Sequence, residues 1–414
     1  MRTLFVHQSF PGQYRHLAPA LAARPGAEVV ALGERHVAAL PGVRTHGYRA
    51  PAGAGARTHR YVRPLEAAVR RGQEAARAAL ALKEGGFTPD LVCCHPGWGD
   101  GLFLRDVFPD ARFLFYFEFH YAHAGADVGF GEPGPVPLEE AARVRVLNAN
   151  NLLSLEAADW GHTATHWQRS RFPDWARPRL SVVHEGVDTD HFRHDAQARF
   201  ALPDGRVLTR DDEVVTYVAR GLEPYRGFPS LMRALPELLR RRPRAQVVIV
   251  GEDATFYGRP PEGGGTWRAA LKAELGERLD ATRIHFAGRI PHAALRRLFQ
   301  VSAVHLYLSY PFVLSWSLLE AMACGCAVLG SATPTVSEVV IDGVTGRLVP
   351  FHAPEAIAAA AADLLADREA GRALGMAARA HMVRVYDLQR VCLPAGLALL
   401  DAVAARATAL SAAG

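Results

Sequence analysis

Short apolar runs alternate with longer amphipathic stretches along almost the whole chain. Apolar runs of this length predict buried strands, whereas apolar positions that recur every third or fourth residue predict helices. In the first half the pattern predicts helices over residues 61–84 and 144–157, and strands over residues 3–6, 28–32, 90–94, 112–117, 158–162 and 180–183.

The second half repeats this alternation with a new set of strands. Strands are predicted over residues 213–219, 246–250, 283–286, 305–308, 327–329 and 347–349. Helices are predicted over residues 228–240, 267–275, 294–302, 316–323, 335–341, 354–365, 370–386 and 388–410. Because a parallel strand pair needs a crossover, usually a helix, two such sets predict an α/β protein with two doubly wound parallel sheets.

Length and composition agree with two domains. A chain of 414 residues is too long for one ordinary core. Its net charge of +5 fits an anionic ligand without requiring one. The basic residues are spread through amphipathic stretches with no recurring aromatic platform, so nucleic acid is not an expected partner.

The cysteine and histidine patterns bear on location and metals. The five Cys have no zinc-site spacing, which predicts reduced, buried thiols. The chain enters a strand at residue 3 instead of a signal peptide, so we expect a cytoplasmic protein. The 18 His form neither an HExxH motif nor a compact His/Asp set, and we therefore expect no metal.

Polar residues follow three predicted strands of the first half. Gly12 lies in the loop after the first strand, and a His-Pro-Gly-Trp-Gly turn with His95 and Trp98 follows the third. The strand over residues 112–117 is followed by a segment that contains Glu118, His120 and Tyr121. The carboxyl ends of parallel strands share one edge of a sheet, where ligands bind. A single His at such a place is more often structural, and spacing does not choose between Glu118 and His120 as an acid or base.

In the second half, Arg220 and Arg226 flank a turn between a strand and a helix. Two guanidiniums beside a helix N-terminus can pair with a diphosphate, although two solvated arginines are the simpler alternative. The stretch over residues 305–330 then reads as strand, loop and helix, with Glu320 about one turn into the helix. The unpaired N–H groups of a helix N-terminus attract anions there.

The segment LEAMACGCAVLG, residues 319–330, resembles the second half of the signature of the family 4 retaining glycosyltransferases, with Glu320 as its second glutamate. The chain departs from the signature at Phe312, which stands where the first glutamate is expected, and at Cys326, which stands where proline is usual. HEGVDTDHF, residues 184–192, resembles the interdomain linker of that family.

The resemblance implies a GT-B architecture, with two Rossmann-like domains facing a central cleft. It implies an N-terminal acceptor-side domain over residues 1–194, on which the C-terminal helix at about 387–414 packs back. A donor-binding domain would cover residues 195–386.

The resemblance also implies roles for individual residues. Catalytic roles would fall to Glu118 or His120 and to Arg220 and Arg226. The donor would contact Gly12, Arg220, Arg226, Gly251, Ile290, Phe312, Val313, Leu314, Ser315 and Glu320. The acceptor side would include His95, Trp98 and Tyr121. Neither a cofactor nor a metal is expected.

The predicted function is therefore retaining transfer of a hexose-type sugar from a nucleotide-diphosphate sugar to a hydroxyl of a glycan, a lipid-linked molecule or a small molecule. Two alternatives stand because Phe312 replaces a glutamate that normally touches the sugar: a silent sugar-nucleotide or glycan-binding protein, and a nucleotide-sugar epimerase. A peripheral position at the inner face of a membrane is an alternative to a purely cytoplasmic one. The base, the sugar, the acceptor and the oligomeric state are not specified by the sequence.

Overall fold

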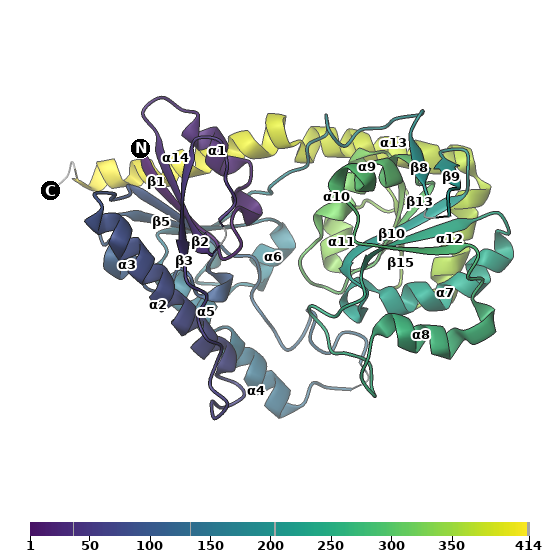
Figure 1. The fold of residues 1–414 in the computed structure, drawn as a ribbon, viewed down its shortest axis with the longest axis horizontal. Coiled ribbons are helices and arrows are strands. Elements are labelled where there is room, and N and C mark those ends of the chain that lie inside the picture. The colour runs from purple at the N-terminus through teal and green to yellow at the C-terminus, as the bar shows by residue number, and fades with distance from the viewer. Residues whose placement is uncertain (36, 133, 203, 412–414) are drawn as a thin grey trace. The chain divides into compact units, whose positions relative to one another are not determined.

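The computed structural model describes residues 1–411 except residues 36, 133 and 203 (Figure 1). It forms two compact units. The N-terminal unit contains Met1–Gly129, Pro133–Glu185 and Cys392–Gly414, and the C-terminal unit contains Phe130–Glu132 and Gly186–Val391. The units divide after Glu185, whereas the resemblance implies a second domain that begins at residue 195. The difference arises because the linker packs in the C-terminal unit: Val187 donates its N–H to the carbonyl of Tyr386, and Phe192 is buried in that unit's core.

The N-terminal unit is built on a seven-stranded sheet in the order β3-β2-β1-β4-β5-β6-β7. All neighbouring strands in it are parallel. The strands are β1 (Arg2–Val6), β2 (Glu28–Glu34), β3 (Val43–Tyr48), β4 (Leu91–Cys94), β5 (Arg112–Tyr116), β6 (Trp160–Thr163) and β7 (Leu180–Val182). The carboxyl ends of β1, β4 and β5, which are adjacent, therefore lie together at one edge.

Helices cover both faces of this sheet. They are α1 (Leu17–Ala22), α2 (Arg63–Glu84), α3 (Leu104–Val107), α4 (Leu138–Leu147), α5 (Ala149–Ala157), α6 (His166–Arg171) and α14 (Leu393–Ser411). One core layer packs α2, α3 and α5 against the sheet, and another packs α1 and α14 against the opposite strand faces. The helix predicted over residues 144–157 is wrong in its start and its continuity, because α4 begins at Leu138 and Asn148 separates it from α5.

The C-terminal unit is built on a six-stranded sheet in the order β12-β11-β10-β13-β14-β15, also parallel throughout. Its strands are β10 (Val214–Gly221), β11 (Gln246–Glu252), β12 (Ile284–Gly288), β13 (Val304–Tyr307), β14 (Ala327–Ser331) and β15 (Arg347–Val349). A small antiparallel pair, β8 (Arg199–Ala201) and β9 (Val207–Thr209), precedes the sheet.

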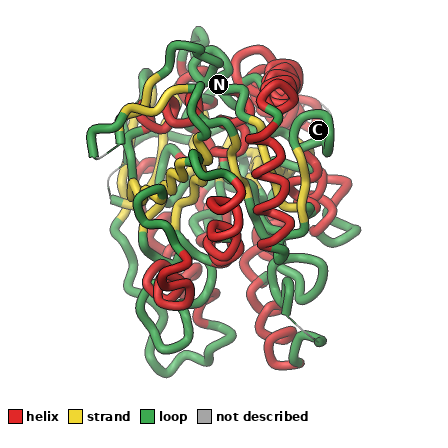
Figure 2. The backbone as a smooth tube through the Cα atoms, turned by 90° about the vertical axis from the view of Figure 1, so that its right-hand side faces the viewer, coloured by secondary structure: helices red, strands yellow, loops and turns green. Residues whose placement is uncertain are grey.

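The helices of this unit again fill two layers. They are α7 (Phe228–Arg241), α8 (Trp267–Leu275), α9 (His292–Val301), α10 (Trp316–Ala323), α11 (Pro334–Val339), α12 (Pro354–Ala366) and α13 (Arg368–His381). Side chains of α7, α8 and α12 share one core with β10, β11 and β13, and those of α10, α11 and α13 share another. Figure 2 shows the helices (red) arranged around the strands (yellow).

The helix type changes from α to π after α13. Met382–Tyr386 and Leu388–Cys392 form π-helical turns before α14, so the predicted helices over 370–386 and 388–410 are not regular throughout. The stretch Leu388–Ala405 has the length and apolar composition of a membrane span, and 28% of it is buried. All five cysteines are free and buried, as predicted.

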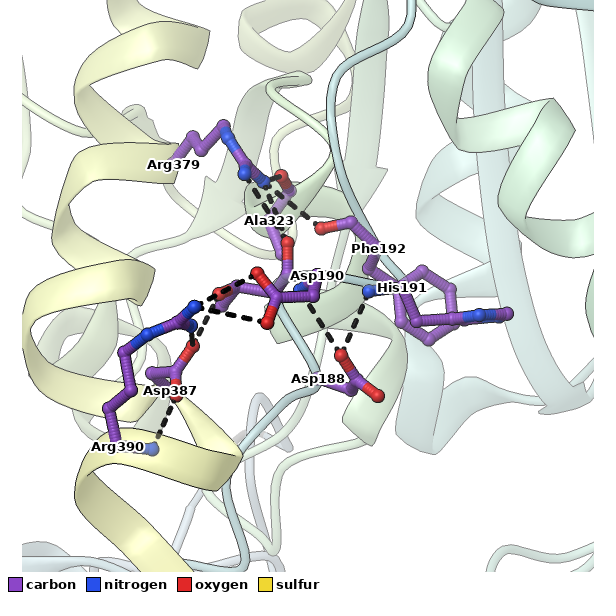
Figure 3. Close-up of polar contacts among 9 residues, drawn as sticks. Asp188, Asp190, His191, Phe192, Ala323, Arg379, Asp387 and Arg390 are labelled. Carbon is purple, nitrogen blue, oxygen red and sulfur yellow. Dashed lines mark hydrogen bonds and ion pairs between the residues drawn. The ribbon is translucent and has the colours of Figure 1, made fainter.

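Arg379 of α13 fastens the linker to the C-terminal unit (Figure 3). Its guanidinium donates to three backbone carbonyls: Thr189 at 3.3 Å, Phe192 at 3.1 Å and Ala323 at 2.6 Å. Two of these carbonyls belong to the linker and the third belongs to the last turn of α10. One arginine therefore ties the linker to the helix that carries Glu320.

A second set of contacts holds the neighbouring linker residues (Figure 3). Asp188 accepts hydrogen bonds from the backbone N–H groups of Asp190 and His191, at 3.1 and 2.8 Å. Arg390 pairs with Asp190 at 3.1 Å and with Asp387 at 2.8 Å. The linker is thus an ordered part of the C-terminal unit.

Candidate functional site

The first candidate site gathers polar side chains at the carboxyl ends of β1, β4 and β5. We call it the N-terminal cluster, and it consists of His7, Gln13, His95, Trp98 and Glu118. Each of these residues lies just after a strand or in the loop that follows it. Because the three strands are parallel neighbours, their exits bring residues that are distant in sequence into contact.

Hydrogen bonds in the N-terminal cluster converge on Glu118. His7 Nδ1 accepts the N–H of Ser9 at 2.9 Å, so the proton of this imidazole lies on Nε2. Nε2 then donates to Gln13 Oε1 at 2.9 Å, and the Gln13 amide donates to Glu118 Oε1 at 3.3 Å. The Nε2 atom of His95 lies 3.6 Å from Glu118 Oε2. The carboxylate is thus approached by two imidazoles, one directly and one through an amide.

The environment keeps His7 neutral. Burial, and after it the nearby His95, lower the pKa of His7 to about 3, although the hydrogen bond with Gln13 acts in the opposite direction. The ring of His95 stacks on Trp98 with centroids 4.5 Å apart, and the ring of His7 lies 5.1 Å from that of His95. The neutral His7 donates from a fixed nitrogen to Gln13 and so orients the amide that donates to Glu118, without adding a positive charge.

Gly12 allows this packing. Its φ of +46° is a left-handed conformation. A Cβ atom at this position would lie 2.6 Å from two carbons of the His7 ring and closer still to Nε2. Only glycine fits both the backbone conformation and the space.

The other two residues predicted near Glu118 are placed differently. His120 packs against Phe172, with ring centroids 5.3 Å apart, and burial followed by the charge of Arg171 lowers its pKa to about 4. Within the described residues neither ring nitrogen of His120 has a hydrogen-bond partner. Tyr121 is held through its backbone, whose N–H donates to Asn148 Oδ1 at 2.9 Å. The hydrogen-bonded cluster therefore contains Glu118 and not His120.

A buried carboxyl group lies in the turn below His95. Asp100 is fully buried and accepts a hydrogen bond from the hydroxyl of Tyr48. Burial raises the pKa of Asp100 to about 6. Its Oδ2 atom has no hydrogen-bond partner among the described residues. This group supports the β4 exit loop at the cost of burying a charge near neutral pH.

The second candidate site surrounds the N-terminus of α10 and is centred on Arg226. We call it the C-terminal cluster: Arg226, Ser309, Phe312, Val313, Ser315 and Glu320. Arg226 is 6% exposed, and its Nη1 atom donates to Ser309 Oγ at 2.9 Å and to the carbonyl of Val313 at 2.8 Å. The arginine therefore fixes the loop between β13 and α10.

Local sequence explains the position of Arg226. The turn Pro224–Arg226 ends at Gly227, which has a φ of +70°. A Cβ atom on Gly227 would lie 2.9 Å from Leu308 Cδ1 and closer to its Cβ, so glycine lets this turn rest on the end of β13. Tyr217 also donates its hydroxyl to the carbonyl of Arg226 at 2.7 Å.

Ser315 begins α10, and Glu320 lies one turn later. The Ser315 side chain caps the helix, and its own N–H donates to the hydroxyl of Tyr307 at 2.7 Å. Glu320 is buried, with Oε1 3.0 Å from His292 Nε2. The carboxylate is thus held at the helix surface by an imidazole, in a position to accept further hydrogen bonds.

Phe312 belongs to an aromatic group. Its ring lies 5.4 Å from that of Tyr225 and 5.2 Å from that of Tyr257, and it is 7% exposed. The position that carries glutamate in the resembled signature is therefore a buried hydrophobic position in this chain.

The remaining predicted donor residues lie on neighbouring strand ends. Arg220 is exposed, and the ring of Phe256 covers its guanidinium at 4.2 Å. A Cβ atom on Gly251 would lie 2.8 Å from the carbonyl oxygen of Ala219, so this glycine allows β10 and β11 to approach closely. Ile290 is half-buried and packs against a core cluster of the same unit, and Leu314 does likewise.

Sequence reasoning missed three residues of these clusters, namely His7, Gln13 and Ser309. It also missed two residues next to the C-terminal cluster: Glu223, which precedes the turn that carries Arg226, and His292, which contacts Glu320. His7 stands at a strand exit, which is the same signal that drew attention to His95. The others are recognised only by their contacts with residues far away in the sequence, and local sequence patterns do not predict such contacts. Within the described residues no group of His, Cys, Asp and Glu has an arrangement suited to a metal ion.

Solved structures define the class of fold. Sucrose-phosphate synthase from Thermosynechococcus elongatus matches with a TM-score of 0.73 and 21% identity, over 98% of this chain and 100% of that chain. Anabaena HepE in complex with UDP matches with a TM-score of 0.66 and 15% identity, over 96% and 99%. The two parallel α/β domains thus have the GT-B architecture.

Family models specify the group. The model described as Glycosyl transferase family 4 group matches residues 25–192, and the model described as Glycosyl transferases group 1 matches residues 202–381. The chain belongs to the group 1 glycosyl transferases and carries a family 4 N-terminal domain.

Curated relatives match part of the chain. The GDP-mannose-dependent alpha-(1-6)-phosphatidylinositol monomannoside mannosyltransferase of Mycolicibacterium smegmatis is 33% identical over 224 residues, which is 52% of this chain and 55% of the relative. The D-inositol 3-phosphate glycosyltransferase of Kribbella flavida is 31% identical over 210 residues, 49% and 46%. The chain spans about half the length of these relatives.

Proposed function

We propose that the protein is a retaining glycosyltransferase that moves a hexose-type sugar from a nucleotide-diphosphate sugar to a hydroxyl group. The observation that supports this most is the buried Arg226, which orders the loop before α10 in a chain that belongs to the group 1 glycosyl transferases. A buried cation at a helix N-terminus is a site for an anionic leaving group.

The donor would bind to the C-terminal unit. Arg226 and Arg220 would pair with the diphosphate, and the N–H groups at Ser315 and the start of α10 would meet its oxygens. Glu320 would accept hydrogen bonds from the ribose hydroxyls. Gly251, Ile290 and Leu314 would line the nucleotide, with Ile290 near the base.

The acceptor would bind to the N-terminal unit. Glu118 accepts a hydrogen bond from Gln13 and lies 3.6 Å from His95 Nε2, so an acceptor hydroxyl would donate to this oriented carboxylate. Trp98 is 38% exposed beside His95 and offers an aromatic face to a sugar ring. We keep His120 and Tyr121 as acceptor-side residues at the edge of this group.

The chemistry needs little from the protein beyond position and charge. The bond between the anomeric carbon and the diphosphate oxygen breaks, the acceptor oxygen bonds to the same face of that carbon, and the acceptor proton leaves with the diphosphate. The arginines stabilise the negative charge that develops on the leaving group. We propose that neither a metal nor a cofactor takes part.

The partners would be a nucleotide sugar and a glycan, lipid-linked or small-molecule acceptor, and the site of action would be the cytoplasm or the inner face of a membrane. The relatives named above point to GDP-mannose as one donor to test, and the HepE structure with UDP points to UDP-sugars.

One observation favours a second candidate, a protein that binds nucleotide sugars without turnover. Phe312 occupies the place of the first signature glutamate and is packed among aromatic rings. Binding without transfer or hydrolysis would select this candidate, and interconversion of the sugar without an acceptor would select an epimerase.

The test is thermal and chemical stability of the purified protein with UDP, GDP, ADP and TDP and their sugars. A ligand at 100 times its Kd stabilises the folded protein by about 2.7 kcal/mol. We expect this increment with one nucleotide in the parent protein and its loss in Arg226→Ala.

The matched control is Arg233→Ala, in the same unit, because among the described residues Arg233 makes only an exposed ion pair with Glu274 at 2.7 Å. Comparison of the increment within each variant removes the intrinsic cost of each substitution. An increment of equal size in Arg226→Ala and in the parent would overturn the proposed donor site.

A further inference from the structure

A second carboxylate in the C-terminal unit has partners of an unusual kind. Glu223 follows the exit of β10 and is fully buried. Its carboxylate accepts three consecutive backbone N–H groups: Phe256 at 3.1 Å, Tyr257 at 2.9 Å and Gly258 at 2.8 Å. Successive N–H groups that converge on one anion form a strong, oriented interaction. This carboxylate thus holds the loop after β11.

The loop held by Glu223 places one aromatic ring on each predicted diphosphate arginine. The ring of Phe256 lies 4.2 Å from the guanidinium carbon of Arg220. The ring of Tyr257 lies 5.5 Å from that of Arg226. Both rings remain partly exposed, at 37% and 39%. Two adjacent loop residues therefore cover two cations that are separated in sequence.

Close approach of the loop depends on a small residue. A Cβ atom on Gly221 would lie 2.5 Å from the carbonyl oxygen of Ala254 and 2.6 Å from the ring of Phe256. The start of the loop is also fixed where the two strands end: the N–H of Leu222, just after β10, donates to the carbonyl of Glu252, the last residue of β11, at 2.9 Å. The loop is thus seated on the strand exit by packing as well as by the carboxylate.

We propose that Glu223 is a positioning residue for donor binding: it anchors residues 256–258 so that Phe256 and Tyr257 orient the guanidiniums of Arg220 and Arg226. The proposal rests on the proposed function of the two arginines. A guanidinium that lies against a ring face keeps its N–H donors in the plane, where a diphosphate can meet them at the edge. Glu223 itself would not touch the donor.

The negative charge of Glu223 explains why its partners are backbone N–H groups and not the two arginines. A carboxylate near a diphosphate site repels the ligand unless its charge is satisfied elsewhere. Three backbone N–H groups satisfy Glu223, so among the described residues its carboxylate makes no ion pair with either arginine. If Glu223 paired with Arg220 or Arg226 instead, its carboxylate would compete with the diphosphate for the same guanidinium, so a backbone partner is the arrangement that fits an anion site.

The experiment compares Glu223→Gln with Glu213→Gln. An amide keeps the shape of Glu223 but turns an NH₂ group toward at least one of the three backbone donors. Glu213 is the matched control, because it lies beside the other end of β10, is 6% exposed and also accepts three hydrogen bonds, from Arg242 and Arg244. Both variants lose buried hydrogen bonds, and only one of them is next to the donor arginines.

Three quantities are measured on the full chain: the KM for the donor nucleotide sugar, the KM for the acceptor, and hydrogen exchange of the 256–258 amides. For Glu223→Gln we expect the donor KM to rise about tenfold, which corresponds to the loss of one or two hydrogen bonds, while the acceptor KM stays constant. Exchange of the three amides should accelerate. Glu213→Gln should lower the stability of the protein and leave the donor KM unchanged, because hydrogen bonds that only stabilise the fold affect the amount of folded enzyme and not its affinity for the donor.

A parental donor KM in Glu223→Gln, or an equal rise in both variants, would overturn the positioning role. If Glu223→Gln does not fold, Phe256→Leu and Tyr257→Leu replace exposed rings and test the same step, with the same expected rise in donor KM and the same refutation. Failure of the proposed donor site would appear separately, as an Arg226→Ala variant that binds nucleotide like the parent.

Discussion

Replacement of Gly12 by Ala tests the N-terminal cluster with little chemical change. The methyl group would overlap the His7 imidazole, and the backbone would keep a φ of +46° only under strain. Gly26 offers the matched control, because it has a φ of +69° in the same unit but no atom of the described residues would lie within 4 Å of its Cβ. The two substitutions share the backbone cost and differ in the displacement of His7.

The magnitudes follow from the contacts. An alanine in the left-handed region costs about 1–2 kcal/mol, which is the whole effect expected for Gly26→Ala. In Gly12→Ala the ring must also move, and His7 would lose its bonds with Gln13 and with the N–H of Ser9. At about 1 kcal/mol each, these losses bring the total to about 3–4 kcal/mol.

Urea unfolding of both variants measures the free-energy difference, and turnover with the nucleotide sugar identified by the stability screen measures function. We expect turnover to fall by about a hundredfold in Gly12→Ala, because Glu118 loses an orienting partner, and to stay near the parental rate in Gly26→Ala. Equal losses of unfolding free energy in the two variants would show that His7 does not fill the space beside Gly12. Normal turnover in Gly12→Ala would remove the cluster from the mechanism.

Two further predictions concern buried polar groups. The pKa of Asp100 lies at about 6 in the folded protein, above its ordinary value of 3.8, so the folded state holds this proton more tightly and loses stability as pH rises through both values. Asp100→Asn lacks this titrating group, so between pH 3 and pH 8 the parent should lose about 3 kcal/mol of unfolding free energy relative to the variant. Urea unfolding of both proteins across this pH range measures the difference. A difference that does not change with pH would contradict a buried, titrating carboxyl group. Arg379→Met should cost about 2–4 kcal/mol in unfolding free energy, because three backbone carbonyls lose their donor. Arg372 lies on the same helix and, within the part of the chain that the structure describes, makes only a 3.5 Å exposed ion pair, so Arg372→Met should cost less than about 0.5 kcal/mol; equal costs would refute the role of Arg379.

The elements that the sequence predicted well are those with a continuous apolar signal. The helix predicted over residues 316–323 is α10, and the strand predicted over 347–349 is β15. Strand β3 was missed because most of its residues are polar and not buried, and β8 and β9 were missed because runs of three residues seldom stand out as strands. The break at Asn148 is likewise invisible in composition, since it interrupts a sequence that is helical on both sides.

The site was less predictable than the fold for a physical reason. Strand exits can be read from the sequence, which is why His95, Glu118 and Arg226 were singled out. The hydrogen-bond partners of such groups lie far away in the sequence. Glu223, for example, accepts the backbone N–H groups of residues 256–258, and nearly every residue type has such an N–H group, so the sequence does not mark them. Position in the fold was therefore predictable, whereas the hydrogen-bond network was not.

The N-terminal unit is discontinuous along the chain, and this affects the order in which it can be completed during synthesis. Phe5, Leu91 and Leu114 share a core with Leu400 and Val403 of α14. A ribosome makes the strands of this unit first, then the whole C-terminal unit, and only afterwards the helix that covers this face of the first sheet. The nascent chain must therefore carry an apolar face that lacks the cover of α14 for most of its translation, during which it would present a binding surface to a chaperone.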